Sequence, residues 1–130
     1  MAKAKTTHQP FEGRNPRGQF TKITQDMMDS AAWKELSLRQ RGLYLQFKSK
    51  YRQKTERGNV TEHNRDEITL PESEWKQEYG NYRTFRKDID ILVRLGFIRL
   101  VQRGQNTRTP NLYGFSVEWQ KWRPTMTATK

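Results

Sequence analysis

The chain of 130 residues contains no cysteine and only two histidines, His8 and His63. Without cysteine there is no disulfide and no thiolate metal ligand. The histidines lie far apart in polar segments, and the sequence has no HxxxH pattern, no glycine-rich phosphate loop and no cluster of carboxylates. The sequence therefore predicts no catalytic site, no metal site and no cofactor, and we expect a protein that is not an enzyme.

Long apolar runs are also lacking. No stretch approaches the ~18 apolar residues of a membrane-spanning helix, and the first residues hold no apolar segment of the signal-peptide type. We therefore expect no membrane association and a cytoplasmic location. The apolar fraction is only 32%, low for a globular domain. Apolar residues crowd into residues 82–119, however, which indicates a small ordered core beneath a polar surface.

Acidic residues are few relative to basic ones. Fourteen Asp and Glu face 25 Lys and Arg, which gives a net charge of +11. A protein this basic attracts polyanions, because protein cations that replace the counterions condensed along a phosphate backbone release them to solution. The composition therefore favours a nucleic-acid partner. The alternative is a solvated basic surface without a partner.

The chain divides into three regions. Residues 1–19 hold four basic residues against one acid and little that could be buried, so they predict a disordered basic arm. We expect one folded domain over residues 20–122 and a flexible tail over residues 123–130. The arm either enters a minor groove, as the arms of some DNA-binding proteins do, or only increases solubility.

Helix signals mark the first half of the domain. After a short strand predicted over Phe20–Ile23, a turn over Ser30–Leu36 is expected to bury Trp33. Ser37, followed three residues later by a glutamine, fits a capping box and predicts a helix start. The apolar stripe of this helix consists of Leu36, Leu43, Phe47 and Tyr51. Residues 53–67 are polar throughout and predict a long loop.

The second half predicts strands on both sides of a helix pair. Ile68–Leu70 predicts a short strand, and Pro71 opens a helix that continues to Tyr79 and ends in a left-handed cap at Gly80. Asn81 then caps a third helix over residues 82–95, and Gly96 ends it. The core stripe of this helix is Phe85, Ile89 and Leu92.

Two β-like runs, Phe97–Val101 and Leu112–Val117, flank the turn-forming residues 102–111 and predict a hairpin. The order of elements predicts an α+β fold of the winged helix-turn-helix type, with a three-helix core and a β-hairpin wing.

The third helix presents a basic face opposite its core stripe. Arg83, Lys87, Asp90 and Arg94 lie within about 30° of the direction away from the core, and Arg86 lies at the flank. In a helix-turn-helix the second helix of the motif enters the major groove, and its first residues meet base edges. Arginine can bind two guanine acceptors there. The alternative for the whole face is a solvated helix exterior.

Asp90 interrupts this basic face and has three open roles. It orients Arg83, Lys87 or Arg94 by ion pairing, accepts a hydrogen bond from a cytosine amine, or simply lies at the surface.

The loop between the two strands adds basic residues, and no carboxylate occurs between residues 91 and 117. Such a wing could reach the adjacent minor groove or the backbone, and the alternative is an ordinary exposed hairpin. The candidate DNA-binding residues are Asn81, Tyr82, Arg83, Thr84, Arg86, Lys87 and Arg94 on the helix and Arg103, Gln105, Asn106 and Arg108 in the wing.

The four tryptophans lie at the ends of predicted elements, which favours core packing over base stacking. They are Trp33, Trp75, Trp119 and Trp122. The last two form a terminal aromatic pair that could also close a dimer interface.

Several stretches resemble winged-helix proteins from mobile elements of Gram-positive bacteria. These stretches are Ile68-Thr69-Leu70-Pro71, Arg83-Thr84-Phe85-Arg86-Lys87, Leu95-Gly96-Phe97-Ile98 and Pro110-Asn111-Leu112-Tyr113-Gly114-Phe115-Ser116. The family includes N-terminal domains of plasmid replication initiators, phage replisome organisers and small accessory proteins of conjugative transfer. The resemblance covers roughly residues 20–122 and specifies the fold better than the biological process.

The resemblance implies binding to repeated double-stranded DNA sites at an origin of transfer or replication. There the protein would recruit or position a relaxase or replication protein encoded elsewhere. Because the second domain of full initiators is lacking, an accessory role such as a relaxosome component is expected. A transcriptional regulator would bind a promoter operator with the same surface, and an RNA binder or protein-interaction module is a further alternative. A homodimer would predict palindromic half-sites, and a monomer direct repeats.

Overall fold

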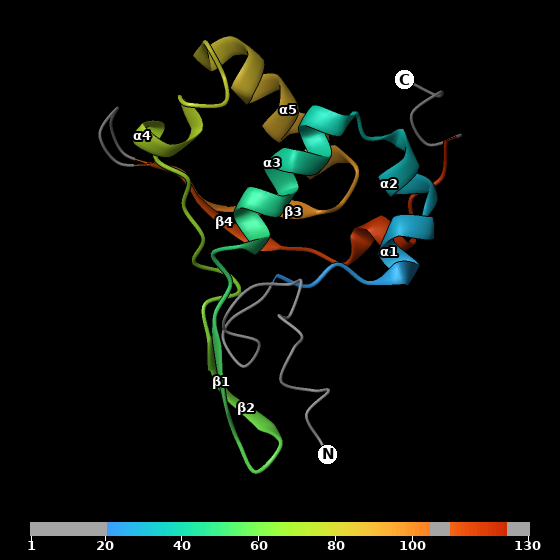
Figure 1. Ribbon diagram of the computed structural model, residues 1–130, viewed down its shortest axis with the longest axis vertical. Coiled ribbons are helices and arrows are strands. Elements are labelled where there is room, and N and C mark those ends of the chain that lie inside the picture. Colours follow the sequence, from blue (N-terminus) through green and yellow to red (C-terminus); the bar gives the residue numbers. More distant parts are fainter. Residues whose placement is uncertain (1–20, 105–109, 125–130) are drawn as a thin grey trace, which may run out of the picture.

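A computed structural model describes residues 21–104 and 110–124, and Figure 1 shows how their helices and strands are arranged. This part of the chain is a mixture of α-helices and antiparallel β-hairpins. Its helices are α1 (Gln25–Asp29), α2 (Ala31–Glu35), α3 (Leu38–Lys48), α4 (Glu72–Trp75), α5 (Tyr82–Arg94) and the 3-10 turn η2 (Glu118–Gln120). Its strands are β1 (Gln53–Glu56), β2 (Asn59–His63), β3 (Ile98–Gln102) and β4 (Leu112–Phe115).

The core lies where α3 and α5 pack over the β3–β4 hairpin, with α1, α2 and η2 closing one end (Figure 1). Tyr44 and Phe47 of α3, Leu92 of α5 and Phe97 are at most 2% exposed. All four tryptophans are buried, which confirms the prediction of core packing. Trp119 stacks on Phe97 with ring centroids 6.2 Å apart, so its ring belongs to the core and not to a surface patch. None of the helices in the described ranges is both long and apolar enough to span a bilayer.

Local capping explains where the first helices begin. The Ser37 side chain accepts from the Gln40 amide while the Gln40 side chain accepts from the Ser37 amide, so the predicted capping box at α3 is confirmed. Ser30 caps α2 in the predicted turn, and Trp33 is buried there. The strand predicted over Phe20–Ile23 is wrong for residues 21–23, and Phe20 lies outside the described residues. Thr24 there caps α1, a helix that the sequence pattern did not predict.

The long loop predicted over residues 53–67 is wrong for most of its length. β1 and β2 form a hairpin, closed by a two-residue turn in which Arg57 and Gly58 have φ of 55° and 83°. Two consecutive positive φ angles are the conformation of a type I′ turn, whose twist matches that of paired strands. The hairpin escaped prediction because every residue of both strands is exposed, so no alternation of apolar and polar residues marks it.

The connection between β2 and α5 differs in part from its prediction. Ile68 exchanges two backbone hydrogen bonds with Tyr113, at 2.9 and 2.8 Å, so the strand predicted over Ile68–Leu70 is a single bridge to β4. The helix predicted to run to Tyr79 ends at Trp75, and Pro71 is its N-cap and not its first residue. Gly80 has no positive φ, so the left-handed cap predicted there is also wrong. The Tyr79 hydroxyl instead donates a hydrogen bond to Asp88 of α5.

The third predicted helix and the hairpin after it are confirmed. α5 covers Tyr82–Arg94, and Gly96 ends it with φ of 90°. A Cβ at Gly96 would lie 2.5 Å from the Trp119 amide nitrogen, so the close approach as well as the φ requires glycine. β3 and β4 pair antiparallel, with Ile98 opposite Phe115.

Candidate nucleic-acid interface

The orientation of α5 follows from its cap and its core stripe. Asn81 has an extended backbone, and its side-chain oxygen accepts a hydrogen bond from the Thr84 amide at 2.9 Å. Phe85, Ile89 and Leu92 are buried against the core. The opposite face of the helix is therefore turned to solvent. Asn81 was also predicted as a DNA contact, but its oxygen is already used by the helix.

The predicted outward face is exposed as expected. Arg83, Lys87, Asp90 and Arg94 all lie at the surface of α5. In the described part of the chain, neither Arg83, Lys87 nor Arg94 has an ion-pair partner. These cations can therefore meet an external anion without first breaking an internal pair.

Arg86 is held by two neighbours on its own helix. Its Nη1 donates to the Tyr82 hydroxyl at 3.1 Å, and its Nε donates to Asp90 Oδ1 at 3.4 Å. The Tyr82 hydroxyl and then the Asp90 carboxylate raise the pKa of Arg86. The partner of Asp90 is thus Arg86, four residues before it, and not one of the three cations predicted.

An aromatic stack beneath the start of α5 supports this arrangement. Trp75 of α4 lies parallel to Phe85, with ring centroids 4.5 Å apart and planes 9° apart. The ring centroids of Trp75 and Tyr82 are 5.9 Å apart, and Tyr82 remains 55% exposed. The tyrosine hydroxyl that holds Arg86 is therefore placed by α4 as well as by α5.

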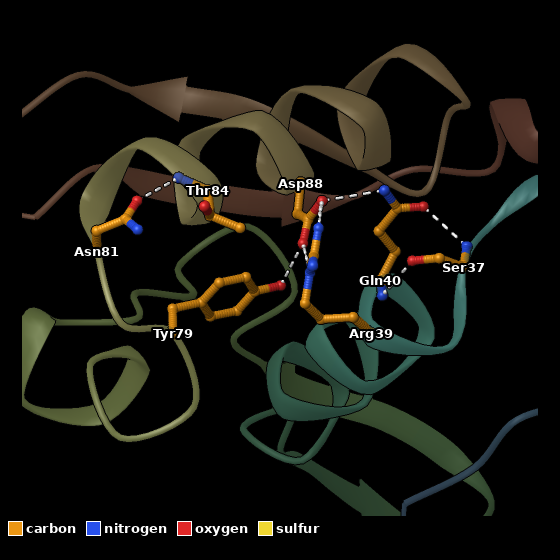
Figure 2. Close-up of polar contacts among 7 residues, drawn as sticks. All are labelled: Ser37, Arg39, Gln40, Tyr79, Asn81, Thr84 and Asp88. Carbon is orange, nitrogen blue, oxygen red and sulfur yellow. Dashed lines mark hydrogen bonds and ion pairs between the residues drawn. The ribbon is translucent and has the colours of Figure 1, made fainter.

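A buried carboxylate on the inner side of α5 ties the helix to the rest of the fold (Figure 2). The Asp88 side chain is 2% exposed. It accepts two hydrogen bonds from Arg39, at 2.6 and 3.1 Å, one from Gln40 at 3.0 Å and one from Tyr79 at 2.7 Å. Arg39 and Gln40 belong to α3, and Tyr79 belongs to the α4–α5 connection. The carboxylate therefore fixes the rotation of α5 relative to both.

These contacts also determine the protonation states of Asp88 and Tyr79. Burial alone would raise the pKa of Asp88, but the hydrogen bonds from Arg39, Gln40 and Tyr79 outweigh it and hold the pKa below its usual value. Burial, together with the hydrogen bond to Asp88, raises the pKa of Tyr79. The carboxylate is therefore charged and the phenol neutral near pH 7.

Sequence reasoning missed Asp88, although a signal was present. Asp88 lies three residues after Phe85 and four before Leu92, on the same side of the helix as the core stripe. A carboxylate at such a position requires buried donors. Its partners lie 49, 48 and 9 residues away, and no local pattern identifies them.

The described part of the predicted wing belongs to the β3–β4 hairpin. Arg103 is exposed just after β3. The Gly104 amide donates to Asn111 Oδ1 at 2.7 Å, and Asn111 Nδ2 donates to the Tyr113 hydroxyl at 3.2 Å. The side chain of Asn111 thus joins the two sides of the loop at its base. The predicted contacts Gln105, Asn106 and Arg108 lie outside the described residues, as do the basic arm of residues 1–19 and residues 125–130 of the tail.

The described residues contain no group of three or more His, Asp or Glu side chains that could hold a metal ion. His63 lies at the exposed end of β2, where its Nδ1 accepts from the Arg65 amide at 3.2 Å. The outer face of α5, where Arg83, Lys87 and Arg94 are exposed and form no ion pair with another described residue, is the candidate site.

No protein-family model matches this sequence, and comparisons with curated proteins and with solved structures found no match either.

Proposed function

We propose that this protein is a non-enzymatic, double-stranded-DNA-binding protein with a winged helix-turn-helix arrangement. α4 and α5 form the helix pair, α5 enters the major groove and the β3–β4 hairpin is the wing. The observation that carries this proposal is the outer face of α5. It exposes Arg83, Arg86, Lys87 and Arg94, and its single acid already binds Arg86.

The chemistry of this face fits a phosphate and base-edge ligand. Arg83, Arg86 and Lys87 lie in the first half of α5, where the positive end of the helix dipole adds attraction for anions. Arg86 is restrained by two contacts, so less conformational entropy is lost when its planar guanidinium binds a ligand. Asp88 holds the opposite side of the helix and keeps the outer face rigid relative to the core.

The biological process is proposed from the resemblance of the sequence. The target sites lie at an origin of transfer or replication of a mobile genetic element, where the bound protein positions a relaxase or a replication protein. A promoter operator would be bound by the same surface, so the choice of DNA fragment decides between these roles.

The test is duplex binding by the purified full chain across a salt series. Fragments from its own genetic neighbourhood, including the origin and the upstream promoter, are compared with scrambled duplex and single strands. We expect one duplex fragment to bind about 10³-fold more tightly than scrambled duplex. Arg83→Ala and Lys87→Ala should each reduce this preference or the salt dependence of binding.

The matched control removes one charge elsewhere. Lys34 is exposed on α2, away from α5 (Figure 1), so Lys34→Ala should leave the preference unchanged. If all duplexes bind equally and the three variants behave alike, the basic charge acts only as a non-specific electrostatic surface and the proposal fails.

A further inference from the structure

The β1–β2 hairpin extends from the body of the protein at the end of the long axis opposite α5 (Figure 1). Its base is fixed by Asn64, which accepts from the Arg52 amide at 2.8 Å and donates to the Lys50 carbonyl at 2.9 Å. Beyond this base, every strand residue is exposed. The hairpin is therefore firmly attached but has no packing partner within the described residues.

Such a hairpin is costly to keep ordered. Two strands without a buried face are marginally stable in water, and three or more strands are usually needed. The positive φ of Arg57 in its turn adds local strain. The geometry therefore suits a binding partner that adds strands.

The charge of the hairpin argues against a phosphate backbone as that partner. Lys54 and Arg57 are balanced by Glu56 and Glu62, so residues 53–63 carry no net formal charge in a strongly basic protein. Lys54 also pairs with Glu62 at 3.4 Å across the strands. A protein surface is the partner that such a mixed-charge edge fits.

Within residues 21–104 and 110–124, no strand pairs with the outer edge of β1, whose backbone is centred on Thr55. Glu56 and Asn59 face each other next to the two-residue turn, where flanking residues exchange the hydrogen bonds that close the loop. The Lys54 carbonyl also faces β2, because it accepts from the Thr61 hydroxyl. The register shift between Lys54 and Thr55 leaves Thr61 of β2 as the extra residue, so β1 keeps its own alternation. The N–H and C=O of Thr55 therefore point away from β2.

We propose that this edge is a dimerisation element, and that β1 pairs antiparallel with β1 of a second copy of this chain across a two-fold axis at Thr55. The two hairpins then form one four-stranded sheet. In this register Lys54 of each copy lies opposite Glu56 of the other, so two opposite-charge pairs form by symmetry. The other strand of the hairpin is not self-complementary in this way, since β2 centred on Thr61 sets Val60 against Glu62.

The two faces of the resulting sheet are also consistent. Thr55 lies opposite Val60 within the hairpin, so a row of four β-branched side chains crosses one face of the sheet. Val60 is 49% exposed in the single chain. On the other face Glu62, Lys54 and then Glu56 of the second copy alternate in charge. β-branched pairs and opposite charges are the cross-strand neighbours that stabilise antiparallel sheets.

This inference does not rest on DNA binding. The hairpin and α5 lie at opposite ends of the molecule (Figure 1), so dimerisation would leave the outer face of α5 open. Association is measured without DNA, and failure of either proposal is therefore distinguishable from failure of the other.

The experiment is sedimentation equilibrium of the full chain from roughly micromolar to millimolar concentration. We expect the wild type to shift from monomer towards twice that mass. Lys54→Glu and Glu56→Lys each create two like-charge pairs across the axis, and each should weaken the dimer by about tenfold or more. An equimolar mixture of these two variants restores both opposite-charge pairs, so association should return as a heterodimer.

A compensated variant separates pairing from hairpin folding. Lys54→Glu combined with Glu62→Lys keeps an ion pair inside the hairpin but creates two pairs of opposed glutamates across the axis, so it should still weaken the dimer. A monomeric wild type at every concentration overturns the inference, as does a mixture that associates no better than its components. If the wild type stays monomeric and Lys54→Glu weakens duplex binding instead, the hairpin contacts nucleic acid and the dimer proposal is wrong.

Discussion

Replacing Asp88 with asparagine tests how α5 is held against the fold. The side chain keeps its shape but loses its charge and one acceptor oxygen. In the wild type, one carboxylate oxygen accepts from Arg39 Nη2 and Gln40, and the other accepts from Arg39 Nε and Tyr79. An asparagine amide has only one oxygen, so it can satisfy only one of these two sides. Its NH2 group must then face the donors on the other side.

The size of the expected loss in stability depends on whether each donor can find a new hydrogen-bond partner. The Tyr79 hydroxyl can rotate and accept from the new NH2 group, whereas the Arg39 Nε–H cannot. Arg39 is 56% exposed and can turn towards water, so its contribution is discounted. A hydrogen bond to a charged group contributes about 1.5–3 kcal/mol. We therefore expect Asp88→Asn to lower the free energy of unfolding by about 2 kcal/mol near pH 7.

The same substitution should change the pH dependence of stability. The pKa of Asp88 lies below its ordinary value of 3.8 in the folded protein, so near that pH the unfolded chain binds more protons. The contribution to stability is thus complete above the unfolded value and is lost as the pH falls through the folded pKa. The difference between wild type and Asp88→Asn should therefore shrink below about pH 4.

Urea denaturation at pH 7 and at pH 3 measures both effects. Asp90→Asn is the matched control, because this carboxylate is on the same helix but its side chain is 63% exposed. Its effect should stay within about 0.5 kcal/mol of wild type. If Asp88→Asn also stays within that range at pH 7, the buried carboxylate contributes no net stability and the reasoning is refuted.

Three further predictions, tested with four substitutions, concern the local geometry. Gly96→Ala places a Cβ against backbone at a φ of 90° and should lower the melting temperature, whereas Gly42→Ala, in open space on α3, should raise it slightly; equal shifts would contradict this. Asn81→Ala removes the α5 cap and should cost about 1 kcal/mol in chemical denaturation, and no loss would refute the cap. Tyr82→Phe keeps the ring but removes one of the two contacts that hold Arg86, so duplex affinity measured by fluorescence anisotropy should fall severalfold without loss of stability; unchanged affinity would mean that this contact does not position Arg86 for binding.

Elements with a strong local signature were predictable from the sequence. The capping box at Ser37, the cap at Asn81 and the end of α5 at Gly96 are each decided by residues within one helical turn. The core stripe of α5 has the helical period, and the same stripe specified which face would be exposed. The candidate interface on α5 could therefore be located from the order of its residues alone.

Elements that depend on distant partners could not be predicted in this way. The β1–β2 hairpin buries nothing, so no periodicity marks it. Pro71 and Gly80 carry the usual signals of a longer helix. The helix nevertheless ends at Trp75, and the Tyr79 hydroxyl donates a buried hydrogen bond to Asp88 of α5. Local propensity contributes only tenths of a kilocalorie to about 1 kcal/mol per residue, and a buried contact can override it.

The sequence by itself determined the basic character of the protein, the residues at which its two main helices begin and the cationic face of α5. Those properties depend on composition and on neighbours along the chain. Only the tertiary structure decided that Asp88 binds Arg39, Gln40 and Tyr79, and that residues 53–63 project as a hairpin whose outer edge pairs with no other strand of the described chain. Both depend on which side chains and backbone groups lie close in space, and sequence separations of up to 49 residues carry no local signal of that closeness.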